Sequence, residues 1–216
     1  MDHKARMAAG LPYKAWKDGL EELRRENKKR IFRFNHLPPD QPKEIAAALG
    51  EILGAMGEGA WIEAPFHCDY GKNIQVGDNF FANYNLTVLD VGQVKIGDNV
   101  LMGPNVSIYA AGHPIHPDAR RSGYEYGQAV NIGSDVWLGG SVVILGGVTI
   151  GEGTVVAAGS VVTRDLPPNV VAAGNPCRVV RPITEADRDF YRRGCPFDVD
   201  DYLVPADAGN GDGALP

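Results

Sequence analysis

An aliphatic residue returns at every sixth position in the second half of the chain, from Ile132 to Val162. Neither an α-helix, which repeats every 3.6 residues, nor a β-strand, which repeats every two, has a period of six. A short period that outlasts single elements is typical of a solenoid, and six residues is a recognised β-helix repeat. We therefore predict an all-β triangular coil with one turn per 18 residues. Its hexad positions are Ile132, Leu138, Ile144, Ile150, Val156 and Val162.

A second series of small or aliphatic residues supports the same coil. These companion positions stand four residues after each hexad position, and glycines such as Gly133 and Gly139 directly follow it, where a sharp corner leaves little room for a side chain. Upstream the pattern continues, with a slip of two positions that predicts a small bulge around Gly92. The companions are Val136, Val142, Val148, Thr154, Ser160 and Leu166, and the upstream hexad positions are Val76, Ala82, Val88, Ile96, Met102 and Ile108.

The repeat is interrupted by a polar stretch that begins at His113, HPIHPDARRSGYEYGQAVN. Long loops in compact domains are usually functional or disordered. Because this one begins with a histidine, we predict a protruding functional loop over residues 113–131.

The N-terminal part has a helical pattern. Residues 13–29 predict an amphipathic helix with Trp16, Leu20 and Leu23 on a narrow apolar stripe, and residues 44–56 predict a second helix. Helices here would protect the exposed end of the coil. We expect a helical region at 1–58, the coil with its loop at 59–183, and a partly disordered extension at 184–216 that ends in ADAGNGDGALP.

Composition limits the partners and the compartment. The 216-residue chain has a net charge of −6, which argues against nucleic acid as a partner. No run approaches the roughly 18 apolar residues that span a membrane, and the N-terminus lacks the apolar stretch of a signal peptide. Three cysteines without a CxxC pair indicate reduced thiols, so we expect a cytoplasmic protein. Arginines nevertheless crowd residues 164–193, which suggests either a small anionic ligand or plain solvated surface.

Histidines are the main candidates for chemistry. His113 stands where the coil breaks out into the loop, held by a rigid scaffold yet open to solvent, as a general base requires. His36 precedes two prolines, where capping or packing is the simpler interpretation. No Ser-His-Asp elbow, P-loop or GxGxxG motif appears, so nucleophilic hydrolysis, nucleoside triphosphates and dinucleotides have no support.

Several long motifs resemble the maltose and galactoside O-acetyltransferases of the hexapeptide-repeat acyltransferase superfamily. They are FHCDYGKNIQVGDNFFANYNLTVLD, KIGDNVLMGPNVSIY, GHPIHPDARRSGYEYGQAVNIG, DVWLGGSVVILGGVTIG and VVTRDLPPNVVAAGNPCRVVR, and they cover nearly all of residues 60–181. The AAGLPYKAW and FNH segments resemble the helical region of this family. The resemblance implies a left-handed parallel β-helix with an N-terminal helical cap, assembled as a homotrimer with sites between subunits.

The resemblance also implies acetylation of a sugar hydroxyl by acetyl-CoA, through direct attack in a ternary complex and with no metal required. The family's base falls on His113, and general-base catalysis is worth about 10²–10⁴ in rate. The family's asparagine, here Asn83, assists at the transition state and contacts the acceptor; Asn85, expected on the same strand face, is the alternative. No acyl-enzyme is needed, so we expect Cys68 and Cys177 to be buried small hydrophobes.

The resemblance also implies which residues of this chain bind acetyl-CoA, position by position. Small residues line the pantetheine arm, and arginines suit bidentate pairing with the adenosine phosphates. Trp137 walls the acetyl or pantetheine end, or alternatively packs on a neighbouring subunit. The other cofactor positions are Gly140, Ala158, Thr163, Arg164, Arg178 and Arg181.

Acceptor recognition departs from the galactoside pattern. The galactoside enzymes have a serine in place of Asp69, consecutive acids in place of Asp90-Val91, and an aspartate in place of Ala15, although Asp18 lies nearby. The CDYG stretch and the single acid after NLTVL are closer to the maltose-type branch. Asp69 and Asp90 are therefore the candidates for binding a maltose or glucose type of acceptor, and capping of coil turns is their structural alternative.

Other functions stay open at this point. The same fold could acetylate an amino sugar or a non-sugar acceptor. A zinc site of the carbonic-anhydrase kind needs three converging histidines, and His67, His113 and His116 are the only possible trio. A non-catalytic trimeric scaffold is the third alternative, and the intact His113, Asn83 and CoA-contacting positions argue against it.

Overall fold

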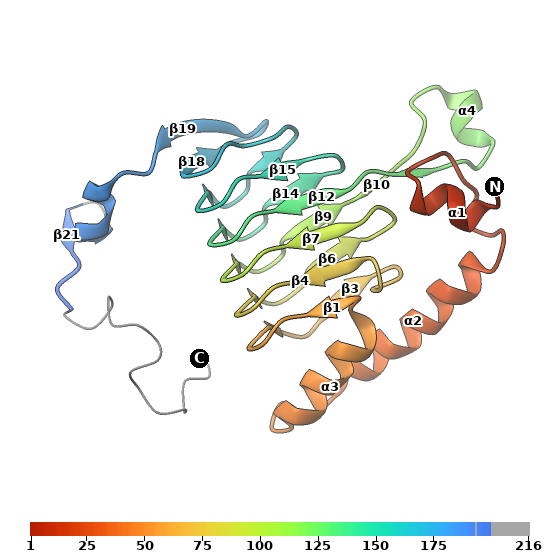
Figure 1. Cartoon of the computed structure of the whole chain (residues 1–216), viewed down its shortest axis with the longest axis horizontal. Coiled ribbons are helices and arrows are strands. Elements are labelled where there is room, and N and C mark those ends of the chain that lie inside the picture. Colours follow the sequence, from red (N-terminus) through yellow and green to blue (C-terminus); the bar gives the residue numbers. More distant parts are fainter. Residues whose placement is uncertain (193, 200–216) are drawn as a thin grey trace.

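The chain folds as a left-handed parallel β-helix with α-helices at its N-terminal end (Figure 1). The computed structural model describes residues 1–192 and 194–199, so the predicted disorder of ADAGNGDGALP lies outside the described residues. The predicted fold class, a β-solenoid with a helical cap, is confirmed.

Three parallel sheets form the three sides of the coil. Side one contains β1 (Ala55–Met56), β4 (Ile74–Val76), β7 (Val94–Ile96), β12 (Val130–Ile132) and β15 (Thr149–Ile150). Side two contains β2 (Trp61–Ile62), β5 (Phe81–Ala82), β8 (Leu101–Met102), β13 (Trp137–Leu138), β16 (Val155–Val156) and β18 (Val170–Ala173). Side three contains β3 (Phe66–Cys68), β6 (Leu86–Leu89), β9 (Ser107–Tyr109), β14 (Val143–Leu145) and β17 (Val161–Val162).

The length of a turn changes along the coil. In the turns that follow the loop in sequence, Trp137 pairs with Val155, 18 residues away, as predicted. In the turns that precede the loop, Phe81 pairs with Leu101, so one turn takes 20 residues. The two extra residues lie at the corner between sides three and one, which confirms the predicted slip near Gly92 and repeats it one turn earlier. We call this corner the wide corner.

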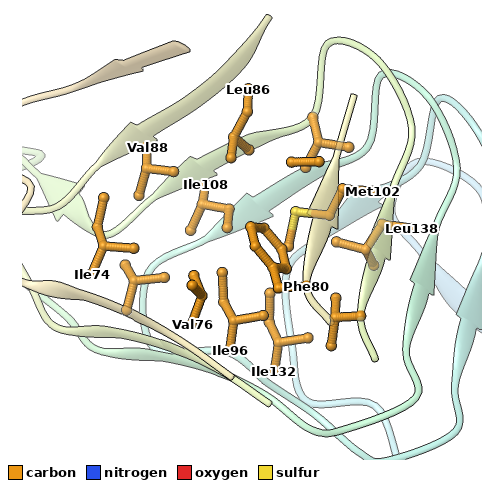
Figure 2. Close-up of a cluster of buried hydrophobic side chains, with 14 of the residues drawn as sticks. Ile74, Val76, Phe80, Leu86, Val88, Ile96, Met102, Ile108, Ile132 and Leu138 are labelled. Carbon is orange, nitrogen blue, oxygen red and sulfur yellow. The ribbon is translucent and has the colours of Figure 1, made fainter. Parts of the chain in front are cut away.

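The coil interior is filled by the hexad and companion positions, all of which are buried (Figure 2). Burying one such aliphatic side chain contributes about 1.5–3 kcal/mol. Thr154 and Ser160, the two polar companions, are also buried, and their hydroxyls donate to the carbonyls of Pro167 and Ala157 at 2.8 and 2.6 Å. The hydrophobic pattern therefore predicted the core correctly.

Successive turns approach closely at the corners. A Cβ atom on Gly139 would lie 2.5 Å from the backbone nitrogen of Ala158 in the next turn. The predicted shortage of space after the hexad positions is confirmed, and its cause is this stacking of turns.

Helices cover the first turn, as predicted. They are α1 (His3–Ala8), α2 (Leu20–Asn35) and α3 (Pro42–Ile52), and Figure 1 shows α2 and α3 at the end of the coil where it begins with β1. Phe34 of α2 and Leu49 of α3 join the same buried cluster as Ile62 of β2.

The predicted bounds of these helices were wrong. The chain does not become helical at residue 13, because Asp18 and Gly19 adopt positive φ angles of 54° and 79° and α2 starts only at Leu20. Trp16 and Leu23 are 52% and 44% exposed rather than part of a buried stripe. The second helix ends at Ile52, and Met56 already belongs to the coil strand β1.

Two segments leave the coil. After β9, the chain forms β10 (Ala111–Gly112), α4 (Pro117–Arg121) and β11 (Tyr126–Gly127) before the coil resumes in β12. At the C-terminal end, β19 (Arg178–Pro182) turns back antiparallel to β18. A 3₁₀ helix (Glu185–Asp189), β20 (Phe190–Arg192) and β21 (Cys195–Pro196) follow. None of the described helices is long and apolar enough to cross a membrane.

Candidate active site

His113 is held at the wide corner by a small antiparallel ladder. Ala111 pairs with Gly127 and Gly112 with Tyr126, so the first residue of the loop is fixed to its end. A Cβ on Gly112 would lie 2.8 Å from the Tyr126 ring, which explains the glycine before His113. The side chain of His113 is 60% exposed, so a rigid backbone presents an accessible imidazole.

A carboxylate that the sequence reasoning missed faces this imidazole. Nε2 of His113 lies 3.8 Å from Oε2 of Glu125, whose side chain is only 18% exposed. The other carboxylate oxygen, Oε1, accepts a hydrogen bond from the hydroxyl of Tyr13. Tyr13 and Glu125 lie 112 positions apart in the chain, so no local pattern could reveal this arrangement.

Asp69 lies at the same corner. It is partly buried beside a groove between α2 and side three, lined by residues that include Lys28 and His67. Burial raises the pKa of Asp69; the charge of Arg24 opposes the rise and that of Glu125 adds to it. Asp69 is thus within electrostatic reach of the carboxylate that faces His113.

Asp90 does not have the surface that a sugar ligand needs, which corrects its assignment as an acceptor-binding residue. It is fully buried, and its Oδ1 accepts the backbone N–H groups of Asp69 and Tyr70, both at 2.9 Å. The structural alternative, in which Asp90 caps a coil turn, therefore describes it. Burial raises the pKa of Asp90 to about 6, while the two backbone hydrogen bonds oppose the rise.

This buried carboxyl predicts a pH dependence of stability. A folded-state pKa of about 6, against an ordinary value of 3.8, gives a stabilising contribution that is complete below pH 3.8 and is lost as the pH rises through 6. The loss is on the order of 3 kcal/mol. Asp90→Asn keeps the accepting oxygen and removes the charge, so its unfolding free energy should not show this fall. Urea unfolding of both proteins between pH 4 and 7 checks this, and parallel pH profiles would contradict it.

Asn83 lies at a different corner, between sides two and three, directly after β5. Its Oδ1 accepts a hydrogen bond from the N–H of Tyr84 at 2.7 Å. The amide nitrogen of Asn83, which is a donor, therefore points away from that N–H group. Asn85 does not share a strand face with Asn83, because both residues lie between β5 and β6, so that expectation was wrong. It has a φ of 65° and donates to Oδ1 of Asn105 in the next turn at 3.1 Å, so it stabilises the corner.

The predicted pantetheine residues follow the corner of Asn83. Ala82, Met102, Leu138 and Val156 stand above one another in the ladder of side two, so Asn83 and the Gly139–Gly140 pair occupy equivalent places in different turns. The N–H of Gly159, which directly follows Ala158, donates to the carbonyl of Gly140 at 2.9 Å. Thr163 and Arg164 are exposed beyond side three, at its wide corner.

A groove crosses the upper part of side two. Trp137, Val155 and Val171 line it from the coil, and residues of the C-terminal extension line it from the other side. Arg181 lies in this groove but pairs with both oxygens of Asp187, at 2.7 and 2.8 Å. That pairing lowers the pKa of Asp187 to about 2. The guanidinium predicted to bind phosphate is therefore engaged within the chain.

The remaining candidates have local roles. The carboxylate of Asp18 accepts the backbone N–H of His3. Nδ1 of His116 accepts the N–H of Asp118 at 3.2 Å and caps α4. No group of three or more histidine, cysteine or acidic side chains within residues 1–192 and 194–199 is arranged to hold a metal ion, so the histidine trio does not converge. Cys68 and Cys177 are buried, as predicted.

Comparisons with known proteins agree with this geometry. The family described as maltose acetyltransferase hexapeptide capping motif matches residues 6–57, and that described as bacterial transferase hexapeptide (six repeats) matches residues 129–164. The galactoside O-acetyltransferase of Escherichia coli K12 is 46% identical over 186 residues, which are 86% of this chain and 92% of the relative.

Solved structures extend the likeness to three dimensions. A galactoside acetyltransferase in complex with coenzyme A matches with a TM-score of 0.89 and 43% identity, over 92% of this chain and all of the other. A maltose O-acetyltransferase from Clostridium difficile 630 matches with a TM-score of 0.84 and 48% identity, over 86% of this chain and 99% of the other. This chain therefore belongs to the maltose and galactoside O-acetyltransferase family of hexapeptide-repeat acyltransferases.

Proposed function

We propose that this protein transfers an acetyl group from acetyl-CoA to a sugar hydroxyl, by direct attack in a ternary complex. The observation that carries the proposal is the exposed imidazole of His113, fixed by a backbone ladder and facing a carboxylate. Kinship with O-acetyltransferases, one of them in complex with coenzyme A, supplies the donor and the kind of reaction.

His113 acts as the general base. One ring nitrogen faces Glu125, and the other takes the proton of the acceptor hydroxyl as its oxygen attacks the thioester carbonyl. The amide nitrogen of Asn83 donates to the resulting oxyanion, a kind of contact worth roughly 3–4 kcal/mol. As the tetrahedral intermediate collapses, the C–S bond breaks and the CoA sulfur leaves with the proton from the imidazolium. No metal and no cysteine takes part.

Acetyl-CoA lies along side two and its corner with side three. Gly140 and Ala158 let the pantetheine arm approach the backbone, and Trp137 walls the adjacent groove. Arg178, at the start of β19, binds a phosphate of the cofactor. Arg181 can bind a phosphate only while its guanidinium also pairs with Asp187. Thr163 and Arg164 lie at the wide corner and contact the cofactor that is bound along side two of the neighbouring subunit.

The complete site needs a second copy of the chain. Asn83 lies at the corner before side three, and His113 lies at the corner after it. A side of about six residues spans roughly 20 Å, which separates these two corners. One chain thus cannot bring both residues to the same carbonyl carbon. We propose a homotrimer in which the His113 corner of one subunit meets the Asn83 corner of the next. The net charge of −6 argues against a nucleic-acid partner, and the three cysteines without a CxxC pair suit a cytoplasmic enzyme.

The acceptor is a maltose or glucose type of sugar. Its hydroxyls bind the carboxylate of Asp69, which lies at the His113 corner in a groove open beside α2. Carboxylates suit this task because each accepts several hydrogen bonds. The amide of Asn83 contacts the same sugar from the neighbouring subunit.

Acceptor-dependent thiol release tests the proposal. Purified protein is incubated with acetyl-CoA and maltose, glucose, a galactoside, glucosamine or no acceptor, and free CoA thiol is measured over time. Release that requires maltose or glucose supports the proposed acceptor class. Release only with glucosamine would move the assignment to amino sugars. Silence with every acceptor would contradict sugar acetylation and direct the search to non-sugar acceptors.

A further inference from the structure

We propose that Tyr13 is a positioning residue of this site, whose hydroxyl holds the Glu125 carboxylate against His113. The inference rests on the proposed function, because it concerns the residue proposed there as the base. It gives Tyr13, in the segment before α2, a part in the reaction.

The backbone ties this segment to the loop. Tyr13 and Glu125 form an isolated antiparallel bridge, in which the N–H of Tyr13 donates to the carbonyl of Glu125 at 2.9 Å and the reverse bond measures 3.0 Å. A Cβ on Gly10 would lie 3.3 Å from the carbonyl oxygen of Gly127, so the preceding residues also touch the end of the loop. The position of Glu125 thus depends on the N-terminal segment.

The two oxygens of Glu125 serve different partners. Oε1 accepts from the Tyr13 hydroxyl, and Oε2 lies 3.8 Å from Nε2 of His113. Because a carboxylate is planar, holding Oε1 also directs Oε2. A carboxylate beside one imidazole nitrogen fixes which nitrogen carries the proton in the neutral ring, and so which one is free to accept a proton.

Tyr13 is suited to hold this carboxylate. Its ring is fully buried in a small cluster that includes Leu20 and Tyr70, so the hydroxyl has a fixed place. Burial, reinforced by the hydrogen bond to Glu125, raises the pKa of Tyr13, and the phenol stays a donor throughout the working pH range.

Tyr70 provides a matched control. Its ring is buried in the same cluster, and its hydroxyl lies close to that of Tyr13 but makes no hydrogen bond to Glu125 within the part of the chain that the structure describes. Tyr70→Phe removes the same atom as Tyr13→Phe from the same cluster, without taking a partner from Glu125.

The kinetic arm compares three variants with wild type. Tyr13→Phe keeps the buried ring and should lower kcat about tenfold, as when the orienting partner of a histidine is removed, while KM for acetyl-CoA stays unchanged. Glu125→Gln should lower kcat by at least as much, and adding Tyr13→Phe to it should cost nothing more. Tyr70→Phe should keep the wild-type kcat. Additive losses in the double variant would overturn the proposal.

The second arm does not depend on turnover. The ¹⁵N spectrum of histidine-labelled protein reports the tautomer of neutral His113, whose signals are those absent in His113→Ala. Wild type and Tyr70→Phe should show one tautomer, whereas Tyr13→Phe and Glu125→Gln should show a mixture. Glu125→Gln leaves the buried Tyr13 ring untouched, so it provides the comparison if Tyr13→Phe folds poorly. An unchanged tautomer in folded Tyr13→Phe would overturn the proposal.

The two arms separate this inference from the proposed function. If no acceptor supports turnover but Tyr13→Phe still mixes the tautomers, the positioning role stands and the proposed transferase reaction fails. If sugar acetylation is observed and Tyr13→Phe changes neither kcat nor tautomer, the reaction stands and the positioning role fails.

Discussion

His113→Ala should lower the rate of sugar acetylation by about 10²–10⁴-fold, because the acceptor hydroxyl loses the group that takes its proton. The loss should appear in kcat, since the proton that His113 takes moves only during the reaction and His113 is not among the residues proposed to bind acetyl-CoA. Steady-state kinetics with acetyl-CoA and the best acceptor of the panel measure it. Affinity for CoA, followed by isothermal titration, should change little.

A neighbouring histidine gives the matched control. His116 lies in the same loop and is also exposed, but its imidazole caps α4. His116→Ala should therefore keep nearly the full rate. If both variants are equally active, the general-base assignment of His113 is wrong.

Asn83→Ala should lower kcat by about 10²–10³-fold, which is the typical cost of removing one oxyanion donor. Asn85→Ala is the matched control, because that side chain bonds to Asn105 at the corner. It should reduce thermal stability and leave most of the rate. A larger kinetic loss in Asn85→Ala than in Asn83→Ala would reverse the two assignments.

Mixing the His113→Ala and Asn83→Ala variants tests whether the site is shared between subunits. When His113→Ala and Asn83→Ala subunits are mixed, each mixed trimer contains one interface at which both wild-type residues meet. Random assembly at equal amounts should then restore about a quarter of the wild-type activity. If both residues acted from one chain, mixing would restore nothing.

The core and the overall coil could be predicted because they follow a sequence period. Each hexad residue points into the coil, so the sequence repeats the geometry directly, and even the slip near Gly92 was visible. The 20-residue turns were less apparent, because their two extra residues lie at a corner outside the buried pattern. Helix starts were predicted less well: Trp16 and Leu23 have helical spacing, but the positive φ of Asp18 keeps the chain from becoming helical before Leu20.

Only part of the candidate site could be predicted from the sequence. His113 was found because it marks the break in the repeat, while Glu125 was missed because its partners come from distant segments. Asp69 and Asp90 illustrate another limit. Both are aspartates just after a strand of side three in successive turns, but Cys68 pairs with Val88, so Asp90 stands one position further into the corner than Asp69. Asp69 is partly accessible there and Asp90 is fully buried.

Direct transfer of the acetyl group from acetyl-CoA to a sugar hydroxyl can be tested by analysing all products of the reaction. A reaction quenched during turnover is divided for thiol titration, mass spectrometry of the sugar and intact mass measurement of the protein. We expect one acetyl ester on the sugar for each CoA released, with the protein mass unchanged. Thiol release without acetylated sugar, or protein that gains one acetyl group during turnover, would contradict it.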